Sequence, residues 1–253
     1  MMKIDILGYW GGFPTRGGAT AGILITTDEG KILLDCGSGV MSKLYLKTKV
    51  ENLSGVILSH LHYDHMGDIG VLQYAMAGAL RTGRAKEKMK IFAPTEPKEI
   101  WNQIQSGQSE NVPLNPLKPL RLAGAEIEFL SVNHTIPCYA VKITYKDEVF
   151  VYSADTEYIE SLIDFAKDAD LFVCEATICE GSSHTVGTGH MDAIEAATIA
   201  KKANVKKLVL THLPSDGDFA LMRRQATEVF GKKMYLASDY VQSSPCMAET
   251  VIR

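Results

Sequence analysis

The sequence predicts an α/β fold built as a four-layer αββα sandwich, in which two β-rich halves pack together and helices cover both outer faces. Short apolar segments separated by glycine-rich and charged turns fill the first third of the chain, as in a meandering sheet. The last third alternates strand-like apolar segments with helical segments. The length of 253 residues, with 46% hydrophobic residues, suits one globular domain over residues 1–253, with loops gathered along one edge.

The individual elements follow from the spacing of apolar residues and from glycine and proline breaks. Strands are predicted at residues 3–7, 22–26, 31–35, 55–59, 89–93, 125–132, 138–145, 148–153, 170–174, 207–211 and 233–236. Helices are predicted at residues 67–83, 95–106, 157–167, 191–203 and 218–230. A Pro- and Asn-rich stretch, residues 111–119, is expected to be a loop.

Composition excludes several classes of protein. The net charge of -4 lacks the cationic surface of proteins that grip long nucleic acids, so no extended nucleic-acid surface is expected. Five scattered cysteines without a CxxC pair argue against a disulfide framework and favour a reducing cytoplasm. The N-terminus has only a short apolar stretch, and no segment approaches transmembrane length, so we expect neither a signal peptide nor a membrane segment.

The segment HLHYDH at residues 60–65 is the strongest chemical signal in the chain. In extended backbone His60 and His62 point to the same side, because side chains alternate with a period of two. Both imidazoles can therefore meet one cation. Asp64 and His65 lie just beyond the strand, where they can turn toward a second cation. This ligand set suits zinc, and manganese or iron could also occupy such a site.

Three further candidate ligands each follow an apolar, strand-like segment, where α/β folds place their ligand-binding loops. His134 follows AEIEFLSVN, Asp155 follows EVFVYSA and His212 follows KKLVLT. A carboxylate such as that of Asp155 can bridge two cations through its two oxygens. The pattern therefore indicates three ligands for each cation, with a bridge between them.

Four segments, in this order, resemble those of the metallo-β-lactamase superfamily: HLHYDH, His134, Ser153-Ala154-Asp155-Thr156 and Leu210-Thr211-His212. The resemblance spans nearly the whole chain and implies the metallo-β-lactamase fold with two Zn²⁺ ions per chain. It implies one zinc held by His60, His62 and His134, the other by Asp64, His65 and His212, and Asp155 as the bridge. Asp rather than Cys at position 155 favours the phosphodiesterase and thioester-hydrolase branches.

Within the superfamily the chain resembles the ribonuclease Z-like branch. The likeness rests on LLDCG at residues 33–37, CEAT at 174–177, and Gly189-His190-Met191 with the helix and strand that follow. It implies that His190 assists phosphate chemistry without binding metal, and it favours a homodimer. One departure is that only 20 residues separate His134 from Asp155, where that family inserts a tRNA-gripping arm. The missing arm puts precursor-tRNA processing in doubt.

These observations predict a dinuclear zinc hydrolase that cleaves a small phosphodiester or an RNA end with metal-activated hydroxide. Asp64 would accept the proton of the attacking water, and His190 would protonate the leaving alkoxide or steady phosphoryl oxygens. A glyoxalase II-like thioester or lactone hydrolase could use the same seven ligands. A metal-binding module without catalytic activity is the third alternative.

Several residues keep two interpretations. His190 could instead be a surface residue at a helix N-terminus, and Asp35 could either orient a ligand histidine or cap a turn. The basic residues between Arg81 and Lys90 could contact a phosphorylated substrate or form a solvated helix end. His184, in a Ser-, Thr- and Gly-rich stretch, has no assigned role.

Overall fold

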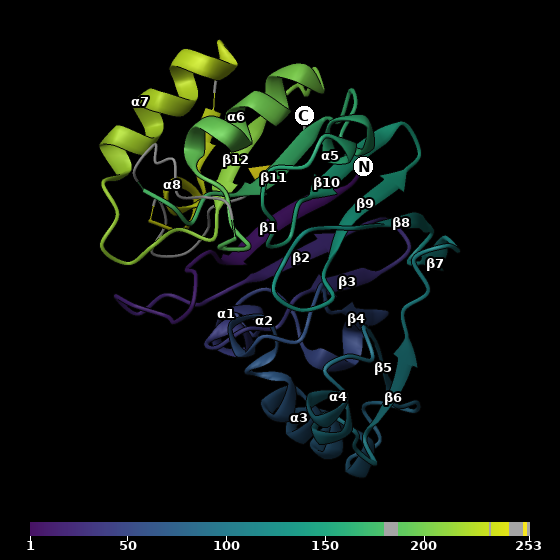
Figure 1. Ribbon diagram of the computed structural model, residues 1–253. Helices are drawn as coiled ribbons and strands as arrows, with labels where there is room; N and C mark the ends of the chain where they lie inside the picture. The colour runs from purple at the N-terminus through teal and green to yellow at the C-terminus, as the bar shows by residue number, and fades with distance from the viewer. Residues whose placement is uncertain (180–186, 233, 243–249, 252–253) are drawn as a thin grey trace.

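The computed structural model describes residues 1–179, 187–232, 234–242 and 250–251, and it has the predicted four layers (Figure 1). The first sheet has seven strands in the order β14-β1-β2-β3-β4-β5-β6. Its strands are β1 (Lys3–Gly8), β2 (Gly22–Thr26), β3 (Lys31–Leu34), β4 (Gly55–Ile57), β5 (Met89–Ala93), β6 (Ser109–Pro113) and β14 (Thr250–Val251).

The second sheet also has seven strands, in the order β13-β12-β11-β10-β9-β8-β7. Its strands are β7 (Leu120–Leu122), β8 (Ala125–Ser131), β9 (Tyr139–Tyr145), β10 (Glu148–Tyr152), β11 (Leu171–Glu175), β12 (Leu208–Thr211) and β13 (Met234–Leu236). Each sheet is antiparallel on one side and parallel on the other, the changes occurring at β3 and β10. Parallel neighbours need crossover connections, and these connections contain the helices.

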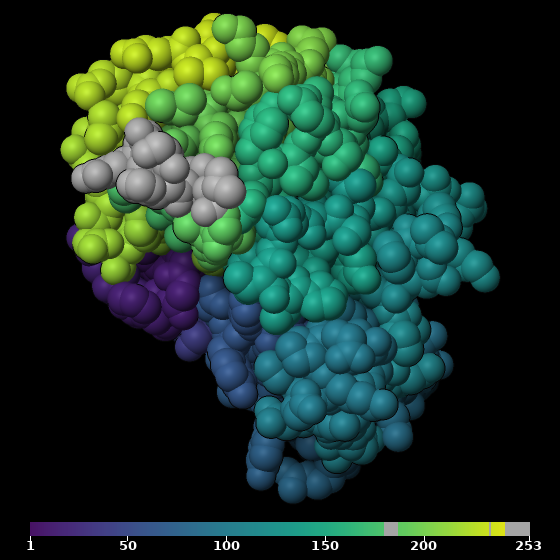
Figure 2. Space-filling model, viewed as in Figure 1, coloured from purple at the N-terminus to yellow at the C-terminus, as the bar shows by residue number. Residues whose placement is uncertain are grey.

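Helices cover the outer face of each sheet (Figure 1). On the first sheet these are α1 (Val40–Leu44), α2 (Tyr63–Met66), α3 (Ile69–Arg81) and α4 (Lys98–Gln103), with a short 3-10 turn η1 (Val50–Asn52). On the second they are α5 (Ser161–Phe165), α6 (Ala193–Lys202) and α7 (Phe219–Phe230), whereas α8 (Ala237–Gln242) contacts both sheets, through β1 and β12. The surface view has α6 and α7 at one end of the molecule and α3 and α4 at the other (Figure 2).

Strand alternation explains why both faces of the first sheet are covered. Leu24 and Leu33 pack with the helices of the outer face. Their neighbours Ile23, Ile32 and Leu34 belong to the core shared with the second sheet. Since successive side chains on a strand point to opposite faces, apolar residues at consecutive positions require a layer on each side.

Each of the predicted strands and helices overlaps an observed element, although α4 and α5 are shorter than expected. The loop predicted at residues 111–119 is partly wrong, because β6 extends to Pro113. This strand pairs in parallel with β5 at the edge of the sheet and buries only Ser109. Its backbone hydrogen bonds therefore hold it without an apolar pattern that a sequence would reveal. The short elements α1, η1, α2, α8, β7 and β14 were also not predicted.

Among the described residues, no helix is both long and apolar enough to cross a membrane.

The core between the sheets gives a stability prediction. Phe150 is completely buried on β10, two residues before Tyr152, whose hydroxyl reaches Asp35 of the first sheet at 3.2 Å. We expect Phe150→Ala to lower the free energy of unfolding by about 3–5 kcal/mol, because it removes a buried ring and leaves a cavity. Urea denaturation measures this. Tyr74→Ala, at an 86% exposed position on α3, should change it by less than about 0.5 kcal/mol; an equal loss in both variants would contradict the core assignment.

Candidate metal centre

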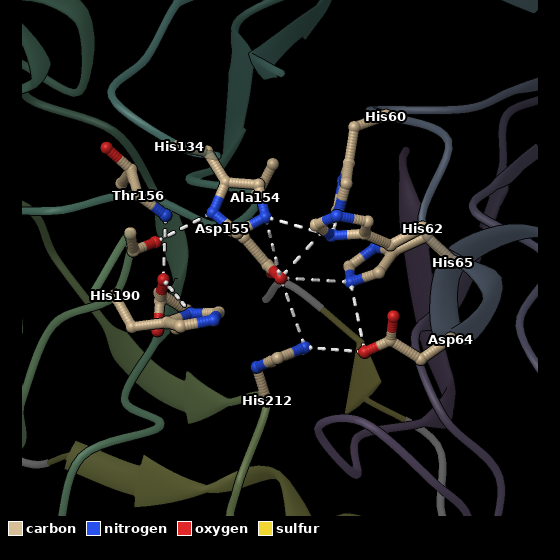
Figure 3. A network of polar contacts seen from close by, with 12 residues as sticks. His60, His62, Asp64, His65, His134, Ala154, Asp155, Thr156, His190 and His212 are labelled. Carbon is tan, nitrogen blue, oxygen red and sulfur yellow. Dashed lines mark hydrogen bonds and ion pairs between the residues drawn. The ribbon is translucent and has the colours of Figure 1, made fainter. Parts of the chain in front are cut away.

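The seven side chains predicted as ligands lie together where the connecting loops leave the strands (Figure 3). His60 and His62 follow β4, and α2 carries Asp64 and His65. His134 follows β8, Asp155 follows β10 and His212 follows β12. Segments far apart in the sequence therefore supply one cluster.

The first group consists of three imidazoles. His62 Nδ1 lies 3.2 Å from His60 Nε2 and 3.0 Å from His134 Nε2. All three nitrogens can point their lone pairs at a common position. This is the arrangement of three ligands around one cation.

The second group contains two carboxylates and two imidazoles: Asp64, His65, Asp155 and His212. His212 Nε2 lies 3.0 Å from Asp64 Oδ2 and 3.2 Å from Asp155 Oδ2. His65 Nε2 lies 3.3 Å from Asp155 Oδ2. The same Asp155 oxygen is 3.7 Å from His60 Nε2 and 3.9 Å from His134 Nε2, so it faces both groups.

These separations fit divalent cations. A tetrahedral zinc with bonds of about 2.0–2.1 Å holds its ligand atoms about 3.3 Å apart. His65 Nε2 and Asp155 Oδ1 are buried and have no hydrogen-bond partner among the described residues. Because leaving such atoms without a partner is costly, both are suited to contact a cation.

Four of the histidines place Nε2 in the cluster. In each of them Nδ1, the other ring nitrogen, has a polar contact of its own. The contacts of Nδ1 are Ser59 Oγ at 3.0 Å for His60, Asp35 Oδ2 at 2.8 Å for His65, the Gly189 carbonyl at 2.8 Å for His134 and Thr177 Oγ1 at 2.6 Å for His212. Such contacts hold the rings in place and leave Nε2 directed at the cation.

Asp35 anchors the second group from behind. Besides contacting His65, its carboxylate accepts hydrogen bonds from the backbone N–H of Ser59 at 2.7 Å, the Ser59 hydroxyl at 2.9 Å and the Tyr152 hydroxyl at 3.2 Å. Of the two interpretations of Asp35, contact with a candidate ligand histidine is therefore the one observed. Asp35 has a left-handed backbone (φ 58°), as have Ala154 and His212 (both φ 52°).

Burial and charge set the protonation of the cluster. Burial lowers the pKa of His60, His62 and His134. These rings are therefore neutral and have a lone pair for metal binding. His65 differs, because burial is outweighed by the carboxylates of Asp155 and Asp35, which raise its pKa well above the ordinary value.

The two carboxylates of the second group are ionised. Burial opposes this in both, yet His212 and His65 hold the pKa of Asp155 well below its ordinary value. The hydrogen bond from His212 and the charge of His65 likewise lower the pKa of Asp64. Ionised carboxylates are the form that binds a divalent cation.

His190 lies against the cluster rather than on the outer surface of a helix. Its ring stacks on His212 with 5.3 Å between centroids and meets the edge of His134 at 5.1 Å. Its Nδ1 lies 3.0 Å from Oε1 of Glu175, a completely buried carboxylate. Burial opposes protonation, but Glu175 raises the pKa of His190 to about 9. The structure also allows His190 as a ligand, which the sequence did not predict, since its ring groups with His134 and Asp155.

Two glycines approach the histidines closely, and neither was identified from the sequence as part of the site. A Cβ atom at Gly11 would lie 2.8 Å from Nδ1 of His212, and one at Gly189 would lie 2.7 Å from Nδ1 of His134. Gly189 also has a left-handed φ of 78°. Glycine is therefore required at both positions. The paired glycines after Trp10 and the TGH segment are the signals that could have indicated this.

Two further contacts were also not predicted. Thr177 donates a hydrogen bond to Glu175 Oε2 at 2.8 Å while contacting His212. The backbone N–H of Gly12 donates to Asp64 Oδ2 at 2.8 Å. Such contacts depend on tertiary structure, so residue type alone does not reveal them.

A pocket of about 370 Å³ opens onto the cluster. It is lined by Gly11, Gly12, Phe13, His62, Asp64, Asp155, Thr177, His190, His212, Pro214, Ser215 and Asp216. Arg84, from the basic segment, lines a separate depression and pairs with Glu51 at 2.8 Å. His184 lies outside the described residues.

Comparison with known proteins gives consistent matches. A family model described as "Beta-lactamase superfamily domain" matches residues 31–213. The chain is 36% identical over 237 residues to the "Probable metallo-hydrolase YhfI" of Bacillus subtilis, covering 93% of this chain and 97% of that protein. The crystal structure of YhfI superposes with a TM-score of 0.89 over 93% of this chain and 96% of YhfI.

Ribonuclease Z proteins are more distant relatives. The chain is 26% identical to Ribonuclease Z of Clostridium novyi, covering 94% of this chain and 97% of that protein. The alignment runs over 309 positions, more than the 253 residues present here, so that protein has segments without a counterpart in this chain. The short form of human tRNase Z shares the fold, with a TM-score of 0.70 at 20% identity over 85% of this chain and 93% of that one.

The contacts behind the cluster predict a change in metal affinity. Asp35→Asn keeps the size of the side chain but removes the charge that faces His65. We expect it to weaken Zn²⁺ binding about 10- to 100-fold, measured by isothermal titration calorimetry, with circular dichroism verifying that the variant is folded. Asp28→Asn is the control, because Asp28 is an exposed carboxylate paired with Lys146. Unchanged affinity in a folded Asp35→Asn variant would show that this contact does not support metal binding.

Proposed function

Because this chain belongs to the metallo-β-lactamase superfamily and is a metal-dependent hydrolase of its ribonuclease Z-like branch, we propose that it is a dinuclear zinc phosphodiesterase. Its substrate would be a small phosphodiester or an RNA end. One zinc would be held by His60, His62 and His134, and the other by Asp64, His65 and His212. Asp155 would bridge them, and Mn²⁺ or Fe²⁺ could replace zinc.

The observation that carries this proposal is the pairing of the two ligand groups through one Asp155 oxygen, with His190 beside them and held by a buried carboxylate. Paired divalent cations in such a site activate water and neutralise charge on phosphoryl oxygens. This chemistry suits a phosphodiester, whose reacting group is negatively charged. The name of the ribonuclease Z relatives supports the same bond class.

His190 would act on the phosphate rather than on the metals. Because the pKa of His190 is raised to about 9, its imidazole is protonated at neutral pH. With Nδ1 held by Glu175, the ring lines the pocket and its Nε2–H remains to donate to a phosphoryl oxygen or to the leaving alkoxide. A cation held in the pocket would also favour an anionic substrate.

Asp64 would accept the proton of the attacking water. Its Oδ2 is engaged with Gly12 and His212. This leaves Oδ1 as the candidate proton acceptor. Since Asp64 also belongs to the second ligand group, its two oxygens would divide the tasks of ligand and base.

The size of the pocket favours a small substrate. Its volume is about 370 Å³. The chain between His134 and Asp155 is a β9–β10 hairpin, antiparallel from Val141 to Tyr145. It provides no long arm to grip a folded RNA. A homodimer and a cytoplasmic location are further parts of the proposal; buried thiols at Cys36, Cys138 and Cys174 suit a reducing compartment.

Metal content and turnover test the proposal together. We expect two zinc equivalents per chain by elemental analysis and hydrolysis of bis(p-nitrophenyl) phosphate. His190→Ala should lower kcat about 100-fold or more at unchanged zinc content, because it removes a proton donor but no proposed ligand. Lys206→Ala, which removes an exposed cation paired with Asp170, is the control and should retain full turnover.

Other results would contradict this function. Zero or one zinc equivalent after reconstitution would exclude the dinuclear site. Loss of zinc in His190→Ala would make His190 a ligand. Hydrolysis of a thioester or lactone without phosphodiester turnover would favour the glyoxalase II-like alternative.

A further inference from the structure

Phe13 is an exposed aromatic ring in the wall of the pocket. Its side chain is 59% exposed, although a phenyl ring gains free energy when it is buried. Seven other large hydrophobic residues among those described are also exposed, and none of them lines this pocket: Met1, Tyr45, Leu46, Tyr63, Val71, Tyr74 and Leu117. Phe13 is therefore an apolar surface placed beside the candidate ligands.

The backbone before Phe13 is fixed to the candidate ligand segments. The N–H of Gly11 donates to the Leu213 carbonyl at 3.0 Å, one residue beyond His212. The N–H of Gly12 donates to Asp64 Oδ2 at 2.8 Å. The N–H of Phe13 then donates to the Gly11 carbonyl at 2.8 Å, which closes a tight turn. These bonds fix the backbone from which the Phe13 ring projects, close to the place where a phosphate would react.

The pocket combines three kinds of group. His190 supplies an imidazole whose Nδ1 lies 3.0 Å from Oε1 of Glu175, and Phe13 supplies an apolar planar ring. Ser215 and Asp216 supply polar oxygens on the loop that follows His212. An anion beside His190, a hydroxyl-bearing sugar and a flat aromatic ring would together satisfy them. A nucleotide has these three parts, and its base can stack on an aromatic side chain.

We propose that Phe13 is a specificity residue that stacks on the nucleobase of the substrate, so that the enzyme prefers phosphodiesters carrying a nucleoside. This inference rests on the proposed phosphodiesterase function. Phe13 has no hydrogen-bonding atoms in its side chain, so the stacking accepts any base. The ring acts on binding and takes no part in proton transfer.

The test uses two substrates with the same leaving group on the zinc-reconstituted enzyme. Thymidine 5′-(p-nitrophenyl phosphate) carries a base, and methyl p-nitrophenyl phosphate does not. The wild type should have the higher kcat/KM with the thymidine ester. Phe13→Ala should lower the ratio of the two kcat/KM values at least about fivefold, mainly through KM, because stacking a base on an aromatic side chain contributes that much or more. Phe13→Trp should restore the ratio.

Leu46→Ala is the matched control, because Leu46 is a 79% exposed apolar residue that lines a different depression. Its ratio should equal that of the wild type. A second readout, independent of turnover, is the dissociation constant of thymidine 5′-monophosphate measured by calorimetry. Phe13→Ala should raise it by a similar factor.

The outcomes separate the two proposals. An unchanged ratio and an unchanged dissociation constant in Phe13→Ala would overturn the stacking role while leaving the phosphodiesterase intact. An equal loss with both esters would make Phe13 a structural residue of its loop and would also overturn the role. No turnover of either ester, with nucleotide binding that still depends on Phe13, would reject the phosphodiesterase function and keep the base-binding surface.

Discussion

The structure depends on one crowded point, where Oδ2 of Asp155 lies within 3.2–3.9 Å of the Nε2 atoms of four histidines. Polar groups packed this tightly are unfavourable in a protein core unless something compensates them. The two sheets carry these side chains on the loops that leave their strands, and buried partners such as Asp35 and Glu175 hold several of the rings from behind. The sandwich can thus be understood as a rigid frame for this cluster.

Local backbone strain accompanies this frame. Asp35, Ala154 and His212 have left-handed φ values, and each lies just after a strand that leads to the site. Such conformations cost about 1–3 kcal/mol each for residues other than glycine. They turn the chain sharply at the strand end, so that Asp35 and His212 face inward and Asp155 follows directly. The favourable free energy of strand pairing offsets this cost, and the strained backbone directs these side chains into the site.

Part of this was predictable from the sequence and part was not. The period-two spacing in HLHYDH and the positions of His134, Asp155 and His212 after apolar strands predicted the cluster, because both signals are local. Thr177 could not be recognised, since its role is to contact His212 across the fold. Gly11 also lies against His212, and only the paired glycines after Trp10 hint at this in the sequence. The strand β6 was not predicted for a similar reason. Its pairing with β5, rather than any pattern in its own polar residues, makes it a strand.

The spread of the cluster along the chain has a consequence for biosynthesis. Asp64 and His212 lie 3.0 Å apart in space but are separated by 148 positions in sequence. A ribosome delivers HLHYDH early and His212 only after most of the protein has emerged. The second group of candidate ligands is therefore completed late in synthesis, once β12 has been made. A nascent or truncated chain would have an incomplete set of the candidate ligands, so tight metal binding at this site would distinguish finished molecules from unfinished ones.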